Sequence, residues 1–169
     1  FTGSSLDYRW VGVRGAREGF ISTTAEGLTI TPYETNIKAA LPTSTLFYRQ
    51  QHLNFTATTT LKYVPRTEKD LAGITCYQSE KFNYVFGVTK KAEDSYIVLQ
   101  RTEKGESSTI ASEKIEGNTP ISLRVTAEGD KYTFSYSVKD DNYKTVGGTV
   151  SGDILSTNVA GGFTGAMIG

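Results

Sequence analysis

An alternation of apolar and polar residues with a period of two constrains this sequence more than any other feature. Between residues 47 and 63 the odd-numbered positions are mostly apolar and the even-numbered positions are polar. Successive side chains of a β-strand point to opposite faces, so this spacing predicts one long strand with one face on a core and one in water. The segments 82–88, 96–98, 121–127 and 132–138 repeat the alternation. The evenly apolar segment 71–78 predicts an inner strand.

Turn signals separate these segments. Glu26-Gly27, Lys104-Gly105 and Glu128-Gly129-Asp130 are such clusters, and segments 32–42 and 64–70 are predicted loops. No window carries the apolar spacing of an amphipathic helix. About a dozen strands, spaced about 8–14 residues apart, favour an all-β antiparallel sandwich or barrel. We expect one domain over residues 7–169, with residues 1–6 as a linker or an artificial chain edge.

The composition excludes several functional classes. Eighteen Lys and Arg residues balance eighteen Asp and Glu residues, so no basic excess is available for nucleic-acid phosphates. No apolar run approaches the roughly 20 residues of a membrane helix. With one histidine, His52, and one cysteine, the chain has no His/Cys cluster for zinc and no internal disulfide. We therefore expect a binding or accessory domain, with neither nucleic acid nor membrane as partner, in the periplasm, the extracellular space or the cytoplasm.

Several segments resemble a known domain family in order and spacing. They are LDYRWVGVRG with GLTITP, YRQQHLNFTATTTLKYVP followed by EKDLAGITCYQSEKFNYVFGV, PISLRVTAEGDKYTFSYS, and GGFTGAMIG. Over nearly all of residues 6–169 the chain resembles the C-terminal β-sandwich of family 43 glycoside hydrolases of the β-xylosidase type. The resemblance implies an antiparallel, concanavalin-like jelly roll that has no catalytic carboxylates of its own.

The same resemblance implies a partner and a site. In the family a five-bladed catalytic propeller precedes the sandwich, and hydrolysis proceeds with inversion between two carboxylates. We therefore expect the propeller of the same polypeptide as partner, xylo- or arabino-oligosaccharides as ligands, and a homo-oligomer as an option. A closing aromatic strand of the family pattern is missing, and the chain stops in an apolar run, so we expect a fragment.

Phe163 is the candidate contribution to that parent active site. In the family a loop of the sandwich places a phenylalanine at the mouth of the propeller's active site, and by motif position this residue corresponds to Phe163. Gly161-Gly162 and Gly165 flank it and allow an exposed excursion of the chain. The alternative is a buried strand residue beside a bulge. An exposed Phe163 would exclude water and hold the leaving sugar.

Arg49, Gln50, Gln51 and His52 carry the strongest suggestion of direct binding. Arginine and glutamine side chains can form paired hydrogen bonds with adjacent sugar hydroxyls. The alternation places Arg49 and Gln51 in the same phase as the apolar Leu53. Under the alternative interpretation these two side chains therefore bond buried backbone groups or line a domain interface.

Trp10 and Tyr77, with Tyr48 and Tyr84, are candidate stacking platforms for a pyranose ring. Aromatic residues at strand spacing more often belong to a core. Trp10 heads a strand expected over residues 9–14, which favours a core or interface anchor.

The remaining charged residues indicate no catalytic or metal site. Asp140-Asp141 is typical of a turn rather than of a glycosidase carboxylate pair. We expect no cofactor; a structural calcium ion is compatible with a jelly roll, but no motif supports it. The predicted function is that of a non-catalytic accessory domain that packs on the propeller. The alternatives are a carbohydrate-binding module that recognises xylan- or arabinan-type glycans on the concave sheet, and an assembly domain.

Overall fold

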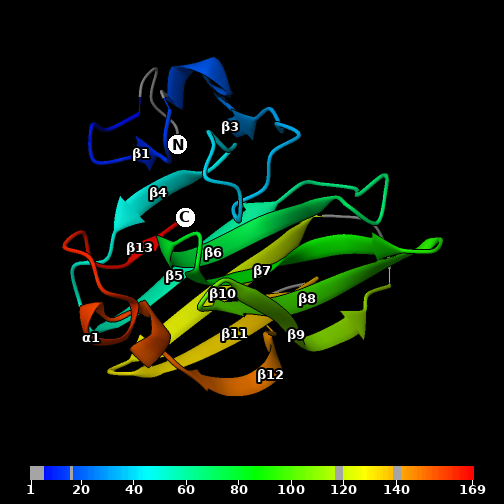
Figure 1. Ribbon diagram of the computed structural model, residues 1–169. Helices are drawn as coiled ribbons and strands as arrows, with labels where there is room; N and C mark the ends of the chain where they lie inside the picture. The colour runs from blue at the N-terminus through cyan, green and yellow to red at the C-terminus, as the bar shows by residue number, and fades with distance from the viewer. Residues whose placement is uncertain (1–5, 16, 117–119, 139–141) are drawn as a thin grey trace.

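Two antiparallel sheets lie face to face in the computed structural model, which describes residues 6–15, 17–116, 120–138 and 142–169 (Figure 1). One sheet has seven strands, the other has four, and a small two-stranded hairpin lies apart from both. The all-β antiparallel fold that the alternation predicted is confirmed, and of the two alternatives, sandwich and barrel, the structure has the sandwich implied by the family resemblance. None of the helices in the described residues is long and apolar enough to cross a membrane.

The order of strands differs from their order along the chain. The seven-stranded sheet runs β1 (Val11–Gly12), β4 (Leu46–Arg49), β13 (Met167–Ile168), β6 (Leu71–Ser79), β7 (Phe82–Lys91), β8 (Asp94–Glu103) and β9 (Glu106–Lys114). The four-stranded sheet runs β12 (Lys144–Ser151), β11 (Lys131–Ser137), β10 (Ile121–Glu128) and β5 (Asn54–Leu61). The hairpin consists of β2 (Ile21–Thr24) and β3 (Gly27–Ile30). The helical turns are η1 (Arg17–Gly19), η2 (Asp153–Leu155) and α1 (Thr157–Ala160).

The core lies between the two sheets and comes from the inward-facing half of each alternating strand. On β10 every second side chain is buried, and on β7 the inward set is Phe82, Tyr84, Phe86 and Val88. Phe134 of β11 is fully buried, and its ring centroid lies 5.6 Å from that of Tyr84 and 5.5 Å from that of Phe86. These contacts join the middle of one sheet to the middle of the other.

The predicted inner strand is confirmed, whereas two strand lengths are wrong. β6 lies between β13 and β7, with residues 74–78 buried. The single strand expected over residues 47–63 is instead two strands in different sheets, β4 and β5, because residues 50–53 cross between the sheets. Leu53, expected on the core face, is 73% exposed in that crossing. The strand expected over residues 9–14 is reduced to β1, whereas segments 32–42 and 64–70 contain no strand.

Two tyrosine hydroxyls link the layers. Tyr84 of β7 donates a hydrogen bond to the carbonyl of Ser151 on β12, at 2.8 Å. Tyr132 of β11 donates to Oε1 of Gln50, which directly follows β4, also at 2.8 Å. Burial raises the pKa of each tyrosine to about 12, because the low-dielectric interior disfavours the phenolate.

Replacing Phe134 by alanine tests the central packing. The cavity left in the core should lower the free energy of unfolding by about 3–5 kcal/mol, measured by urea denaturation. Phe163→Ala is the matched control, since that ring is fully exposed and its loss should change stability by about 0.5 kcal/mol or less. Equal losses in the two variants would contradict this packing.

The buried tyrosines also predict a pH dependence. An unfolded tyrosine has a pKa of about 10, so the unfolded state loses phenolic protons before the folded state does. The stabilisation is complete below pH 10 and is lost as the pH rises toward 12. A Tyr84→Phe/Tyr132→Phe variant should therefore lose less unfolding free energy between about pH 10 and 12 than the unsubstituted chain. Parallel pH profiles would contradict the assignment.

Candidate functional site

Phe163 lies in the loop 161–166 between α1 and β13, and its side chain has a relative exposure of 105%. Gly161, Gly162 and Gly165 have φ values of +73°, +77° and +67°, in the left-handed region that favours glycine. These conformations direct the chain outward around Phe163. Phe163 is therefore an exposed loop residue, and the alternative of a buried strand residue is wrong.

Three carbonyl groups of this loop accept hydrogen bonds from the seven-stranded sheet and its border. Nε2 of Gln78 donates to the carbonyl of Gly161 at 2.7 Å, and Nη1 of Arg49 donates to that of Thr164 at 2.6 Å. The backbone N–H of Gln50 donates to the carbonyl of Ala166 at 3.0 Å. Figure 1 shows the loop, in red, beside the segment that leaves β4. Arg49 thus bonds a backbone group, although that side chain is exposed rather than buried.

The crossing segment 50–53 borders the same loop. Gln50, Gln51, His52, Leu53 and Ala166 line an open hollow of about 200 Å³. Gln50 is half-buried and bonded to the Tyr132 hydroxyl, whereas Gln51 and His52 are exposed. The alternation predicted Gln50 on the water-facing side and Gln51 on the core side, and both predictions are wrong. The reason is that the strand ends at Arg49, so the alternation does not continue through the crossing.

Trp10, which directly precedes β1, forms an aromatic pair with Tyr48 of β4, the residue before Arg49. It is half-buried, and its ring meets the ring of Tyr48 edge to face, with centroids 5.4 Å apart. The Arg9 guanidinium lies 5.3 Å from the centroid of the Tyr48 ring. A hydrogen bond and ion pair with Asp7 raise the pKa of Arg9 above its usual range. Trp10 thus packs edge to face on Tyr48, and its role as a core or interface anchor stays a prediction.

The candidate role of Tyr77 and Tyr84 as sugar-stacking platforms is wrong, and the favoured interpretation, that aromatic residues at strand spacing belong to a core, is confirmed for both. Their side chains are only 4% and 1% exposed. The Tyr77 ring stacks on Phe47, with centroids 5.2 Å apart and planes 21° apart. Tyr84 points into the sandwich and bonds Ser151. Strand spacing of aromatic residues therefore signals core in these two cases.

A second hollow of about 400 Å³ lies over β7, β8 and β9, away from Phe163. Thr89, Val98, Gln100 and Thr109 belong to its lining, with Glu68, Lys90 and Lys91. Apart from Lys90, the lining residues of β7 and β8 alternate with the core residues Val88, Ile97 and Leu99, so they point away from the sandwich interior. The lining combines hydroxyl, amide, ammonium and carboxylate groups.

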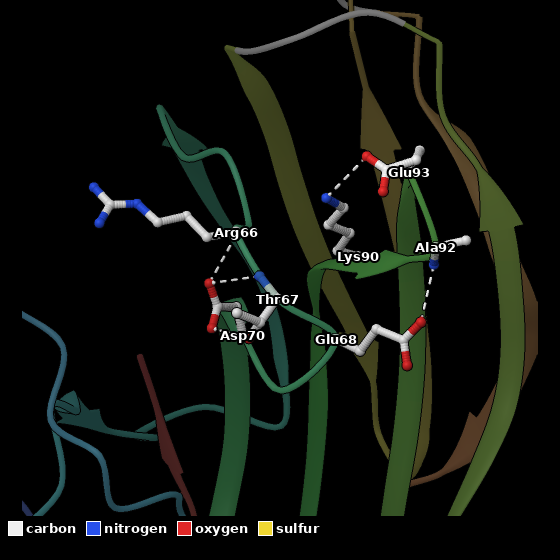
Figure 2. Close-up of polar contacts among 7 residues, drawn as sticks. All are labelled: Arg66, Thr67, Glu68, Asp70, Lys90, Ala92 and Glu93. Atoms are coloured by element: carbon white, nitrogen blue, oxygen red, sulfur yellow. Dashed lines mark hydrogen bonds and ion pairs between the residues drawn. The ribbon is translucent and has the colours of Figure 1, made fainter.

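The loop before β6 borders this second hollow and is held by its own polar contacts (Figure 2). The Asp70 carboxylate accepts from the backbone of Arg66 at 2.8 Å and from the Thr67 hydroxyl at 2.7 Å. These bonds favour the ionised carboxylate and lower the pKa of Asp70. Oε1 of Glu68 accepts from the backbone N–H of Ala92 at 2.9 Å, which ties the loop to the β7–β8 turn.

Residues for metal chemistry do not converge in the described chain. Across 6–15, 17–116, 120–138 and 142–169, no group of three or more His, Cys, Asp or Glu residues could hold a metal ion. Asp140-Asp141 lies outside the described residues. Cys76 is buried, which raises the pKa of its thiol.

Gln78 is the functional candidate that sequence reasoning missed. It is one amide at the end of the evenly apolar segment 71–78, which predicts an inner strand and no functional residue. The pairing of β6 with β7 is irregular between Tyr77 and Ser79, so the alternation shifts at this residue. The signal available in the sequence is a single amide that ends an apolar run, and the structure shows that this amide is buried.

A family model for the β-xylosidase C-terminal concanavalin A-like domain matches residues 1–169. The chain is 26% identical over 171 residues to the non-reducing end alpha-L-arabinofuranosidase BoGH43B of Bacteroides ovatus, covering 100% of this chain and 32% of that protein. The chain thus spans about a third of the length of this curated relative.

Solved structures share the fold. A crystal structure of a GH43_12 protein retrieved from a capybara gut metagenome superposes with a TM-score of 0.91 at 42% identity, covering 100% of this chain and 33% of that one. The GH43 protein BlXynB of Bacillus licheniformis superposes with a TM-score of 0.90 at 22% identity, covering 99% of this chain and 34% of that one. The second likeness concerns the fold alone.

Proposed function

The chain belongs to the family of β-xylosidase C-terminal concanavalin A-like domains found in family 43 glycoside hydrolases, and from this we propose that it is a non-catalytic accessory domain. In this proposal it packs on the catalytic domain of the same polypeptide and places Phe163 at the mouth of that domain's active site. The parent enzyme then releases xylose or arabinose units, and the bond-breaking residues belong to the catalytic domain.

One observation carries the proposal: a phenylalanine ring is held fully in water on a glycine-bounded loop. A surface of the catalytic domain that covers this ring would remove its apolar area from water, which favours packing of the two domains at this loop. Leu53 is 73% exposed and lines the hollow of about 200 Å³ together with Ala166 of the Phe163 loop, so it offers a second exposed apolar side chain near this loop. Against a sugar-binding pocket, the ring would exclude water and limit the space for the bound sugar.

The first test is Phe163→Ala in the full-length enzyme that contains this chain. Loss of the ring should lower kcat/KM on xylobiose by about tenfold, equivalent to about 1.4 kcal/mol. Phe163→Tyr keeps the ring and should retain most of the activity. Ile110→Ala, a partly exposed position on β9, is the control. A change within about twofold for Phe163→Ala would reject the assignment of this pocket residue.

A second candidate function is glycan binding in the hollow over β7, β8 and β9. What favours it is the lining, in which Gln100, Thr109 and Lys91 offer hydrogen-bonding groups that suit sugar hydroxyls. Gln50, Gln51 and His52 line the other hollow, and neither they nor Arg49 belong to this lining.

Calorimetric titration with xylo- and arabino-oligosaccharides tests this second function. A binding module should show a dissociation constant of about 1 mM or tighter, weakened at least about fivefold by Gln100→Ala with Thr109→Val. Absence of heat up to about 10 mM ligand would remove the second function and leave the accessory role.

A further inference from the structure

The backbone of the loop 161–166 must be held in one conformation if Phe163 is to stay exposed. Three glycines in residues 161–165 allow many conformations, and fixing each residue of such a segment costs conformational entropy. Leu53 and Ala166 line the hollow beside the loop and offer apolar surface onto which a free ring would fold. The outward conformation therefore needs anchors that hold the loop backbone.

We propose that Gln78 and Arg49 are positioning residues that hold the Phe163 loop open toward the catalytic domain, an inference that rests on the proposed role of Phe163. Their two bonds reach carbonyl groups on opposite sides of Phe163. Gln78 bonds Gly161, two residues before it, and Arg49 bonds Thr164, the residue after it. The ring thus lies between two fixed points of the backbone.

Strand order explains why these two residues reach the loop. β13, which follows the loop, lies between β4 and β6 in the seven-stranded sheet. Met167 pairs with Arg49 on one side and with Tyr77, the neighbour of Gln78, on the other. The two anchors therefore come from the two strands that flank β13, at the same level of the sheet.

Gln78 occupies its place at an energetic cost. Its side chain is 7% exposed, and its Oε1 atom is buried without a hydrogen-bond partner among the described residues. Burying an unpaired amide oxygen is unfavourable, so the amide is not explained by stability of the core. Its Nε2 atom bonds Gly161, and a Cβ added to Gly162 would lie 3.2 Å from it. The loop therefore packs directly on this amide.

Arg49 supplies the second anchor from the surface. Its guanidinium is exposed, but the bond to Thr164 is charge-assisted and 2.6 Å long. Arg49 is the last residue of β4 and its backbone is paired with Met167, so the distance between strand and loop is set by the sheet. A lysine at this position keeps a charged donor and provides a conservative variant.

The test uses the full-length enzyme with Gln78→Met and Arg49→Met, which remove each donor at similar side-chain volume. Each variant should lower kcat/KM on xylobiose by about three- to tenfold, and neither should lower it further when combined with Phe163→Ala. Arg49→Lys should recover most of the loss. Arg66→Met, an exposed arginine in the loop before β6, is the matched control.

Hydrogen exchange separates this inference from the proposed function. In Gln78→Met and Arg49→Met the amides of residues 162–165 should exchange at least about fivefold faster than in Arg66→Met, with the amides of β7 unchanged as a reference for folding. If Phe163→Ala leaves kcat/KM unchanged, the proposed function fails while faster exchange still supports the anchors. Unchanged exchange in both variants, or kinetic losses that add to that of Phe163→Ala, would overturn the positioning role.

Discussion

The pairing of Met167–Ile168 between β4 and β6 is the contact on which the arrangement of the molecule depends. These two residues connect the strands near the beginning of the chain to the long strands of the seven-stranded sheet. The neighbouring Gly169 exchanges two backbone hydrogen bonds with Thr75, at 2.6 and 3.0 Å. A Cβ at Gly169 would lie 1.8 Å from the carbonyl oxygen of Leu46, so only glycine fits this approach. The Phe163 loop leads into this strand and is placed by it.

The crossing at residues 50–53 is the second point at which distant segments meet. There the chain leaves one sheet for the other, and Gln50 contacts both the Ala166 carbonyl and the Tyr132 hydroxyl. The loop that exposes Phe163 is thereby connected to the four-stranded sheet as well as to its own. Polar groups thus fix the surface features, while the apolar contacts around Phe134 hold the two layers together.

Much of the fold was predictable because a strand buried on one face has apolar residues at every second position. The strands around Phe86, Leu123 and Phe134 were predicted on this basis, and these three residues are fully buried. The same rule failed at Leu53, since alternation describes a continuous strand and does not record where a chain changes sheets. The sequence left Tyr77 open between core and stacking platform for a related reason: it shows that the residue is aromatic, but not that Phe47 covers its ring.

The sequence by itself determined an all-β antiparallel domain and, through its resemblance to a family, singled out Phe163. Local rules suffice for this, because strand alternation, glycine-bounded turns and the scarcity of His and Cys are properties of neighbouring residues or of composition. Only the tertiary structure decided that the Phe163 ring is exposed and that Gln78 and Arg49 hold its loop. The physical reason is the distance along the chain: Gln78 and Gly161 are 83 positions apart, and Arg49 and Thr164 are 115 positions apart. Such contacts arise only when sheet pairing brings the strands together.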